Sequence, residues 1–440
     1  MKKILPGLLL WLGTLPASTQ TPKRSALISE ADLAFLQTLT KAVVEKARVL
    51  PGQKLSEANV NNSGGTLITP GGNYPPFWIR DYAMALESGF VTGPEQKHML
   101  NLTASTQCDR TWITKTGSLI PYGSIADHIR LSDSLPIYFP GTYNFEEQGD
   151  KNFGRLPPYC DQFYFVQMAW YYVKSTGDRK ILTGAINGKK LIDRLETAFA
   201  LPASRLDNEI VYTTDAFRAV DFGFRDVITI TGDLCFPSLL KYQAAKQLAE
   251  LFEKIEDKAK AAHYLAIAAK IRKAIPYLFS DGRGMLRAST GKSNQPDVWA
   301  TALAAYLGVL EGNNLIMTSR FLAEAYRKGI LDYKGNIRHV LTTDDFHEKT
   351  AWEFSLADKN KYQNGAYWGT PTGWVAWTIA QTEPESARQL VKAYVDDLRQ
   401  NDFRKGTGFG APFECFHPSG YQQNPVYMTT VAGPYIVFKD

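Results

Sequence analysis

The sequence alternates between two kinds of segment with helical periodicity. Residues 162–173, QFYFVQMAWYYV, are apolar nearly all round, whereas residues 178–199 carry a narrower apolar stripe. A helix that is apolar on every side is buried, and a striped helix keeps one face in water. The same pair recurs at residues 235–254 with 258–279, 298–310 with 314–330, and 372–380 with 385–398.

Two further pairs extend this pattern towards the ends of the chain. Residues 79–90 precede a striped segment at 94–106, and an amphipathic segment at 29–49 is matched by an apolar one at 424–438. A closed ring would bury the apolar set completely and leave the striped set outside. We therefore predict an all-α fold, an (α/α)6 barrel of six helical hairpins, as one domain over residues 21–440.

The predicted connections alternate in length. Links from a buried helix to the next striped helix are short, and links from a striped helix to the next buried one are long. Long loops inside a compact domain are usually functional. In a ring they would gather on one face, so we expect the functional site there. The long links are residues 50–77, 107–161, 201–234, 280–297, 331–371 and 401–423.

Residues 1–20, MKKILPGLLLWLGTLPASTQ, have the features of a secretory signal peptide. Two lysines precede an apolar stretch, and small residues follow it. We expect a bacterial protein that is periplasmic or secreted, with no membrane anchor. In an oxidising compartment, Cys108, Cys160, Cys235 and Cys415 could form disulfides, and their spacing does not select a pairing.

Composition and motifs exclude several function classes. The net charge is only +5 and the basic residues are scattered, so we expect no nucleic-acid partner. HExxH and GxSxG motifs are absent, as is metal-ligand spacing of Cys and His, so we expect neither a metal nor another cofactor. The remaining chemistry-bearing residues are carboxylates and aromatics, which indicate glycoside cleavage by two carboxylates. We expect a monomer acting on an oligosaccharide or polysaccharide.

One carboxylate stands in an unusual frame. GFGAPFECFHPSG places Glu414 between two phenylalanines, with glycines on both sides. Pro412 and Pro418 stiffen the loop, and the glycines permit tight turns or a close approach of the backbone to a ligand. A loop of this kind holds a side chain in fixed geometry, so we predict that Glu414 is a working group.

A second cluster of acids lies near the middle of the chain. DAFRAVDFGFRDVI contains Asp221 and Asp226 among phenylalanines. An apolar environment raises the pKa of a carboxyl, as a general acid requires, whereas a neighbouring Arg225 lowers it. For any one of these aspartates a structural network with arginine is the alternative interpretation.

Further side chains could bind a sugar. Trp78 could stack on a sugar ring, and Arg80 and Asp81 could bind hydroxyls, or the last two could form a buried pair at a helix start. Other candidates are Trp299, Tyr367, Trp368 and His417.

Three stretches resemble the six-hairpin glycosidases, the group of glucoamylases, trehalases and processing α-glucosidases. FWIRDYAM resembles their W-x-R-D stretch, NGAYWGTPTGW resembles their N-G-x-x-W segment, and PFECFHPSG is similar to their E-x-Y-x-P-x-x-G stretch, with Phe416 in the usual place of Tyr. The resemblance implies that Glu414 is the general base. It also implies that the general acid lies in the loop that holds Asp221 and Asp226.

Because Asp226 directly follows Arg225, we predict Asp221 as the acid, with Arg225 and Asp226 contacting substrate. We expect an inverting mechanism, for which the two carboxyls lie about 6.5–9.5 Å apart. Two alternatives remain open. One is a polysaccharide lyase or sugar epimerase using Tyr143, His128 and Arg155 from one long loop. The other is a non-catalytic glycan-binding protein.

Overall fold

The computed structural model describes residues 24–150 and 152–439, and within them the chain forms twelve α-helices. The signal peptide predicted at residues 1–20 lies outside the described residues. The odd-numbered helices are α1 (Glu30–Ala47), α3 (Gly93–Ser105), α5 (Leu191–Ala200), α7 (Lys258–Phe279), α9 (Gly312–Arg327) and α11 (Pro384–Asn401). The even-numbered helices are α2 (Ile79–Ala85), α4 (Tyr159–Thr176), α6 (Cys235–Lys254), α8 (Val298–Tyr306), α10 (Thr372–Ile379) and α12 (Met428–Phe438).

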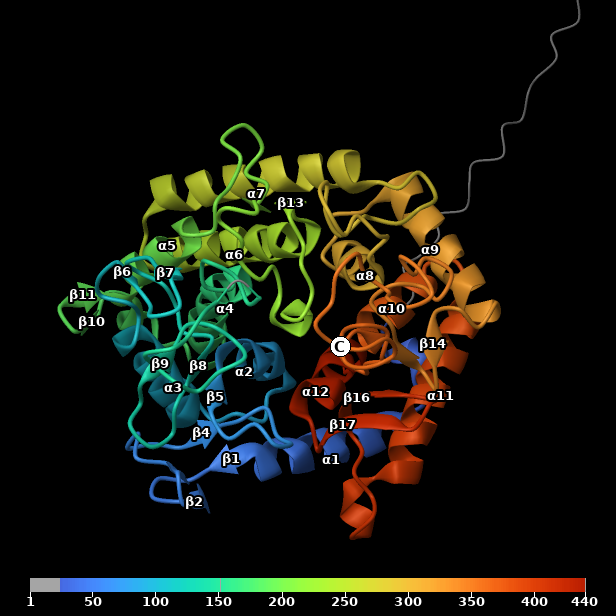
Figure 1. Ribbon diagram of the computed structural model, residues 1–440, viewed down its shortest axis with the longest axis horizontal. Coiled ribbons are helices and arrows are strands. Elements are labelled where there is room, and N and C mark those ends of the chain that lie inside the picture. The colour runs from blue at the N-terminus through green and yellow to red at the C-terminus, as the bar shows by residue number, and fades with distance from the viewer. Residues whose placement is uncertain (1–23, 151, 440) are drawn as a thin grey trace, which may run out of the picture.

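The even-numbered helices contact one another in chain order. Contacts run from α2 to α4, α6, α8, α10 and α12, and α12 also packs against α2. Each odd-numbered helix packs on this set, for example α1 on α12, α7 on α6 and α11 on α10. Figure 1 shows α1, α7, α9 and α11 at the periphery, with α6, α8, α10 and α12 inside them.

Burial follows the predicted distinction between the two kinds of helix. In α8, α10 and α12 nearly every residue is buried, as their continuous apolar sequences require. In α9 and α11 the buried residues form one stripe, and charged residues cover the opposite face. None of the described helices combines the length and the apolar character needed to cross a membrane.

The prediction of an all-α chain is wrong in its connections, which fold into small antiparallel sheets. The pairs are β1 (Arg48–Val49) with β4 (Leu67–Ile68), β2 (Lys54–Ser56) with β3 (Asn59–Val60), β6 (Trp112–Ile113) with β7 (Leu119–Ile120), β10 (Ala185–Ile186) with β11 (Lys189–Lys190), β12 (Tyr212–Thr213) with β13 (Gly232–Asp233), β14 (Asp332–Tyr333) with β15 (Asn336–Ile337), and β16 (Phe413–His417) with β17 (Tyr421–Pro425). A three-stranded sheet contains β5 (Phe77–Trp78), β8 (His128–Ile129) and β9 (Pro136–Ile137).

Several predicted helices are shorter than expected, and α2 and α8 end early, at Ala85 and Tyr306. Residues 178–199 contain a 3-10 turn (Arg179–Leu182) and the β10–β11 hairpin before α5 begins, because Gly184 and Gly188 interrupt the helical sequence. Residues 424–427 belong to the end of β17 and the turn that follows it, so α12 begins only at Met428. The other 3-10 segments are Arg24–Leu27, Leu86–Ser88, Gly223–Arg225 and Phe403–Lys405.

All four cysteines are buried and are free thiols, so the structure contains none of the disulfides that they could have formed. The alternation of long and short connections is present. Long segments precede every even-numbered helix, for instance residues 106–158 before α4 and 328–371 before α10, whereas residues 255–257 suffice between α6 and α7.

Candidate active site

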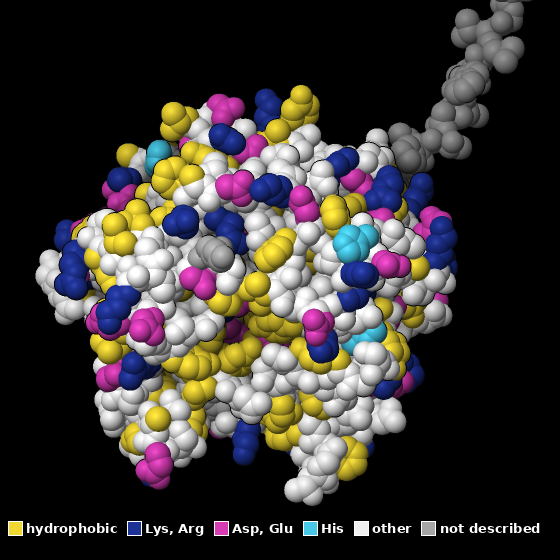
Figure 2. Space-filling model, in the orientation of Figure 1, with side chains coloured by type: hydrophobic (Ala, Val, Ile, Leu, Met, Phe, Trp, Pro, Cys, Tyr) yellow, Lys and Arg dark blue, Asp and Glu magenta, His cyan; other side chains and the backbone are white. Residues whose placement is uncertain are grey.

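Five of the long connections meet at a cavity of about 320 Å³. Figure 2 shows acidic side chains recessed near the middle of this face, between hydrophobic ones. The cavity is lined by Pro70, Tyr74, Trp78, Arg80, Asp81, Gly141, Thr142, Tyr143, Phe153, Phe224, Asp226, Val227, Tyr362, Glu414, Gln423 and Tyr427. Three carboxyl groups, two of them at the positions singled out in the acidic loops, therefore face one enclosed space.

Glu414 projects from the β16–β17 hairpin and is only 1% exposed. Asn424 of the facing strand donates Nδ2–H to Oε2 at 2.6 Å, and the Tyr74 hydroxyl donates to the same oxygen at 3.2 Å. Burial raises the pKa of Glu414 to about 8; the Asn424 bond opposes the shift, and the charges of Asp81 and Asp226 add to it. The hairpin thus fixes this carboxyl, and its burial favours the protonated form.

Asp226 follows the 3-10 turn in the connection before α6. Gln363 donates Nε2–H to Asp226 Oδ1 at 2.6 Å, while its Oε1 accepts the Val227 N–H at 3.0 Å. Burial raises the pKa of Asp226 to about 6, and the positive charge of Arg80 is the largest opposing influence. Gln363 therefore bonds both the Asp226 carboxyl and the next backbone N–H. Because these two bonds fix the side chain, the second oxygen of Asp226 keeps a defined direction.

Asp81 lies in the first turn of α2, where the Tyr427 hydroxyl donates to its Oδ1. Burial raises its pKa to about 6, and Arg80 opposes the shift. Arg80 Nη1 donates to Asp127 Oδ1 and lies 3.7 Å from Asp161 Oδ1. The guanidinium is therefore already committed to carboxylates behind the cavity wall.

Gly223 allows this arginine to reach its place. A Cβ atom at Gly223 would lie 1.8 Å from Arg80 Nε, so any larger residue would displace the guanidinium. The Arg80 guanidinium lies over the ring of Trp78, 4.9 Å from its centre, and this ring is also stacked on His128 at a centroid distance of 4.3 Å.

The structure does not place Asp221 at the cavity, contrary to its predicted role as the acid. Its Oδ2 pairs with Arg225 Nη2 at 2.9 Å, and Arg225 Nη1 also bonds Asp297. All three side chains are buried. Their arrangement is the structural network that was the alternative interpretation of this cluster. Spacing explains the error, because Arg225 turns back to the residue four positions before it and Asp226 faces the cavity instead.

Other predicted sugar-binding residues also lie away from the cavity. Trp299 and Trp368 are fully buried and pack edge to face at 5.8 Å. Tyr367 stacks with His417 at 5.9 Å, and His417 lines a separate hollow on the other side of the hairpin. Their sequences indicated aromatic surfaces, but core packing accounts for Trp299, Tyr367 and Trp368, and His417 is half-buried outside the cavity. The predicted residues that do line the cavity are Trp78, Arg80, Asp81, Asp226 and Glu414.

The side chains that sequence reasoning missed come from distant segments. Tyr74, Tyr362 and Tyr427 add three aromatic rings, and Gln363 and Asn424 hold the two acids. Only their positions in the long connections gave a signal for them.

The three residues considered for a lyase are not assembled at the cavity. Tyr143 lines it, but His128 is fully buried and its Nδ1 lies 2.7 Å from Asp127 Oδ2. Arg155 is exposed and does not line it. Across residues 24–150 and 152–439 there is also no group of three His, Cys, Asp or Glu side chains able to hold a metal.

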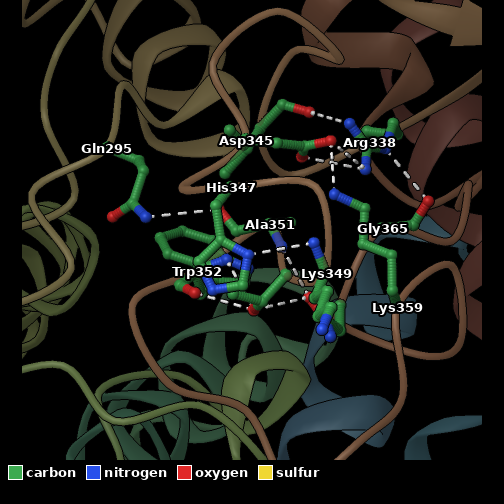
Figure 3. Close-up of polar contacts among 12 residues, drawn as sticks. Gln295, Arg338, Asp345, His347, Lys349, Ala351, Trp352, Lys359 and Gly365 are labelled. Atoms are coloured by element: carbon green, nitrogen blue, oxygen red, sulfur yellow. Dashed lines mark hydrogen bonds and ion pairs between the residues drawn. The ribbon is translucent and has the colours of Figure 1, made fainter.

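A polar network supports the connection between α9 and α10 that delivers Tyr362 and Gln363 (Figure 3). Arg338 donates Nε–H to the Gly365 carbonyl at 3.0 Å and pairs with Asp345 at 3.1 Å. Trp352 Nε1 donates to the Gln363 carbonyl at 3.1 Å. This long loop is thereby fixed where it approaches Asp226.

The Asp221 network leads to a prediction about stability. We expect Asp221→Asn to lower the free energy of unfolding by about 3 kcal/mol, because it leaves the buried Arg225 with less compensating charge. Urea denaturation would measure this loss. The rate of the folded variant should stay within about tenfold of the wild-type rate. Full stability with abolished activity would instead return Asp221 to the reacting centre.

No protein-family model matches the sequence, and comparison with curated proteins finds no match. Solved structures do resemble it. A family GH78 rhamnosidase of Bacillus sp. GL1 superposes with a TM-score of 0.54 at 11% identity, over 92% of this chain and 34% of that one. A structure described as a wild-type glycosidase gives 0.53 at 12% identity, over 94% and 98%. This chain therefore has the fold of these glycosidases, and it spans about a third of the rhamnosidase.

Proposed function

We propose that the protein is a glycoside hydrolase with an (α/α)6 barrel fold, and that Asp226 and Glu414 are its reacting pair. The observation that carries the proposal is the cavity itself, where two buried carboxyls face one space and each is held by a side-chain amide. Glycoside hydrolysis needs this arrangement, one group to protonate the leaving oxygen and one to activate water. The helical circuit and the two glycosidases of the same fold support the barrel.

We assign Asp226 as the general acid and Glu414 as the general base. Both groups that contact Glu414, Asn424 and Tyr74, donate hydrogen bonds, so they stabilise an ionised carboxylate. The pKa of Glu414 lies above that of Asp226, which favours the reverse assignment, and the leaving-group experiment in the Discussion distinguishes the two.

The charge of the cavity favours a neutral sugar. Asp81, Asp226 and Glu414 line it, and its one lining cation, Arg80, is held by Asp127. A uronate would meet acids rather than a free cation. This charge balance makes elimination from a uronate the weaker proposal, as does the position of His128 and Arg155, neither of which lines the cavity. A buried Glu414 that faces the cavity also favours an enzyme over a protein that only binds glycans.

The test is hydrolysis of a panel of α- and β-linked neutral disaccharides and oligosaccharides, with product anomers followed by NMR. We expect one linkage to be cleaved with inversion. Release of the retained anomer would contradict the single-displacement mechanism, and absence of cleavage across the panel would contradict hydrolysis of neutral sugars.

The pH dependence of kcat/KM should be bell-shaped. One carboxyl must be protonated and the other ionised, so activity falls below about pH 6, where both carry protons, and above about pH 8, where both are ionised. Initial rates from about pH 4 to pH 10 would measure both limbs. A profile without an alkaline limb would contradict a protonated group in the reaction.

We further propose that residues 1–20 direct export and that residues 21–440 act as a monomeric domain. A pI of about 8.7 and 44% hydrophobic residues are compatible with a globular exported enzyme. Mass spectrometry of the N-terminus of the mature protein, together with its size in solution, tests both points. Retention of Met1 would contradict export through this segment.

A further inference from the structure

A second cavity of about 520 Å³ lies between the connection that precedes α4 and the β10–β11 hairpin. Aromatic and basic side chains form its walls, notably Trp112, Tyr122, Lys189 and Arg194. The connection that builds it also builds the catalytic cavity. Tyr143 lines the catalytic cavity, and Phe145, two residues later, lines the second one.

The charge of the second cavity is opposite to that of the catalytic one. Its lining includes three cations, Arg110, Lys189 and Arg194, and one acid, Asp109. Within the part of the chain that the structure describes, no ion pair involves any of these three cations. The cavity therefore presents an excess of positive charge.

Arg194 gives the strongest evidence that this cavity binds an anion. It is 8% exposed, and its donors bond neutral oxygens, the Ile186 carbonyl at 2.6 and 3.2 Å and Gln107 Oε1 at 3.1 Å. A guanidinium has five N–H groups, so donors remain after these three bonds. A buried cation is costly without a countercharge. By contrast, the buried Arg80 and Arg225 each pair with carboxylates.

The ammonium group of Lys189 also bonds only neutral oxygens among the hydrogen bonds of the described residues. Its Nζ donates to Thr197 Oγ1 at 2.6 Å and to the Tyr122 hydroxyl at 3.2 Å, and it lies 5.2 Å from the centre of the Tyr122 ring. Trp112 also lines the cavity and stacks on Phe145 at 5.4 Å, which fixes the indole. Rigid aromatic faces beside cations suit a ligand with a ring and an oxyanion.

We propose that the second cavity binds an acidic sugar residue, one that carries a carboxylate or a sulfate. Arg194 and Lys189 would receive the oxyanion, and Trp112 and Tyr122 would contact the ring. Together with the proposed hydrolysis of a neutral sugar, this site would hold the enzyme on a polysaccharide that contains both kinds of residue. Binding of the acidic sugar in this cavity does not require the hydrolytic reaction, so it can be measured separately.

Isothermal titration of the full chain with glucuronate at low salt tests the proposal, with glucose and sodium sulfate as comparison probes. Free glucuronate has no glycosidic bond, so its binding is measured whether or not the protein is a hydrolase. We expect saturable binding that weakens about tenfold in Arg194→Gln, which removes a charge-assisted contact. Lys189→Gln should weaken it in the same direction and leaves the Arg194 contacts in place.

The matched control is Lys190→Gln, which removes an exposed neighbouring charge outside the cavity and should leave affinity unchanged. Glu414→Gln should also bind glucuronate normally. Absence of saturable binding, equal binding of glucose, or affinity unaffected in both Arg194→Gln and Lys189→Gln would overturn the proposal. Sulfate bound as tightly as glucuronate would overturn its sugar part, because a simple oxyanion would then explain the site.

Discussion

Glu414→Gln should lower kcat on an unactivated oligosaccharide by about three to four orders of magnitude. The amide has nearly the same shape and can still accept from Asn424 and Tyr74, but it cannot take a proton from water. The loss is therefore expected in the chemical step, with KM changed little. Single-turnover and steady-state rates on the linkage found in the panel would measure it.

The same substitution, Glu414→Gln, should make the protein more stable than wild type at alkaline pH. Burial raises the pKa of Glu414 from 4.5 to about 8, so the folded protein binds this proton more tightly than the unfolded chain does. The resulting stabilisation is complete below about pH 4.5 and is lost as the pH rises through about 8. Glu414→Gln lacks this loss, so its stability relative to wild type should rise between about pH 4.5 and about pH 8. The matched control for the rate is Glu353→Gln, which changes an exposed glutamate outside the cavity. Activity within tenfold of wild type in Glu414→Gln would contradict its role.

Asp226→Asn should separate substrates by their leaving groups. We expect kcat/KM to fall by about two to four orders of magnitude on an ordinary oligosaccharide, because the leaving oxygen loses its proton donor. On an aryl glycoside whose leaving group needs no proton, the loss should be much smaller. Comparing the two substrates in the same variant measures the acid role directly.

The same pair of substrates tests the alternative assignment. If Glu414→Gln, rather than Asp226→Asn, retains activity on the activated glycoside, then the acid and base exchange places, as the higher pKa of Glu414 favours. Asp221→Asn is the control within the same loop and should show no dependence on the leaving group. Equal losses on both substrates in Asp226→Asn would contradict an acid role for this residue.

The helices could be predicted from the sequence because the spacing of apolar residues shows how much of each helix is buried. The buried α8, α10 and α12 are apolar on all faces, and the striped α9 and α11 are not. The connections show no such periodic spacing of apolar residues. Most of their strands have only two residues, too few for alternation to be visible, and the small sheets were missed.

The candidate site could be predicted only in part. Glu414 stood out because glycines and prolines frame it, and the W-x-R-D stretch at the start of α2 singled out Trp78, Arg80 and Asp81, which line the same cavity. Asp221 was preferred because proximity in sequence between Asp226 and Arg225 was taken as contact, whereas Arg225 bonds Asp221 and Asp297, and Asp226 lines the cavity.

The partners of the two acids could not have been found from local sequence. Gln363 reaches Asp226 from a position 137 residues away, and Tyr74 reaches Glu414 across 340 residues. These contacts exist only once the helical circuit brings distant connections together. Aromatics such as Trp299 and Trp368 failed for the related reason that a core and a sugar platform require the same residue types.

The most direct test of the central claim is cleavage of the linkage found in the panel in water enriched with oxygen-18, with products analysed by mass spectrometry. Hydrolysis at the Asp226 and Glu414 cavity predicts one labelled oxygen at each new reducing end in the wild type. It also predicts almost no product in Glu414→Gln. Unlabelled products that are lighter by one water would show elimination, and labelled products formed equally by both proteins would place the chemistry elsewhere; either result would contradict the account.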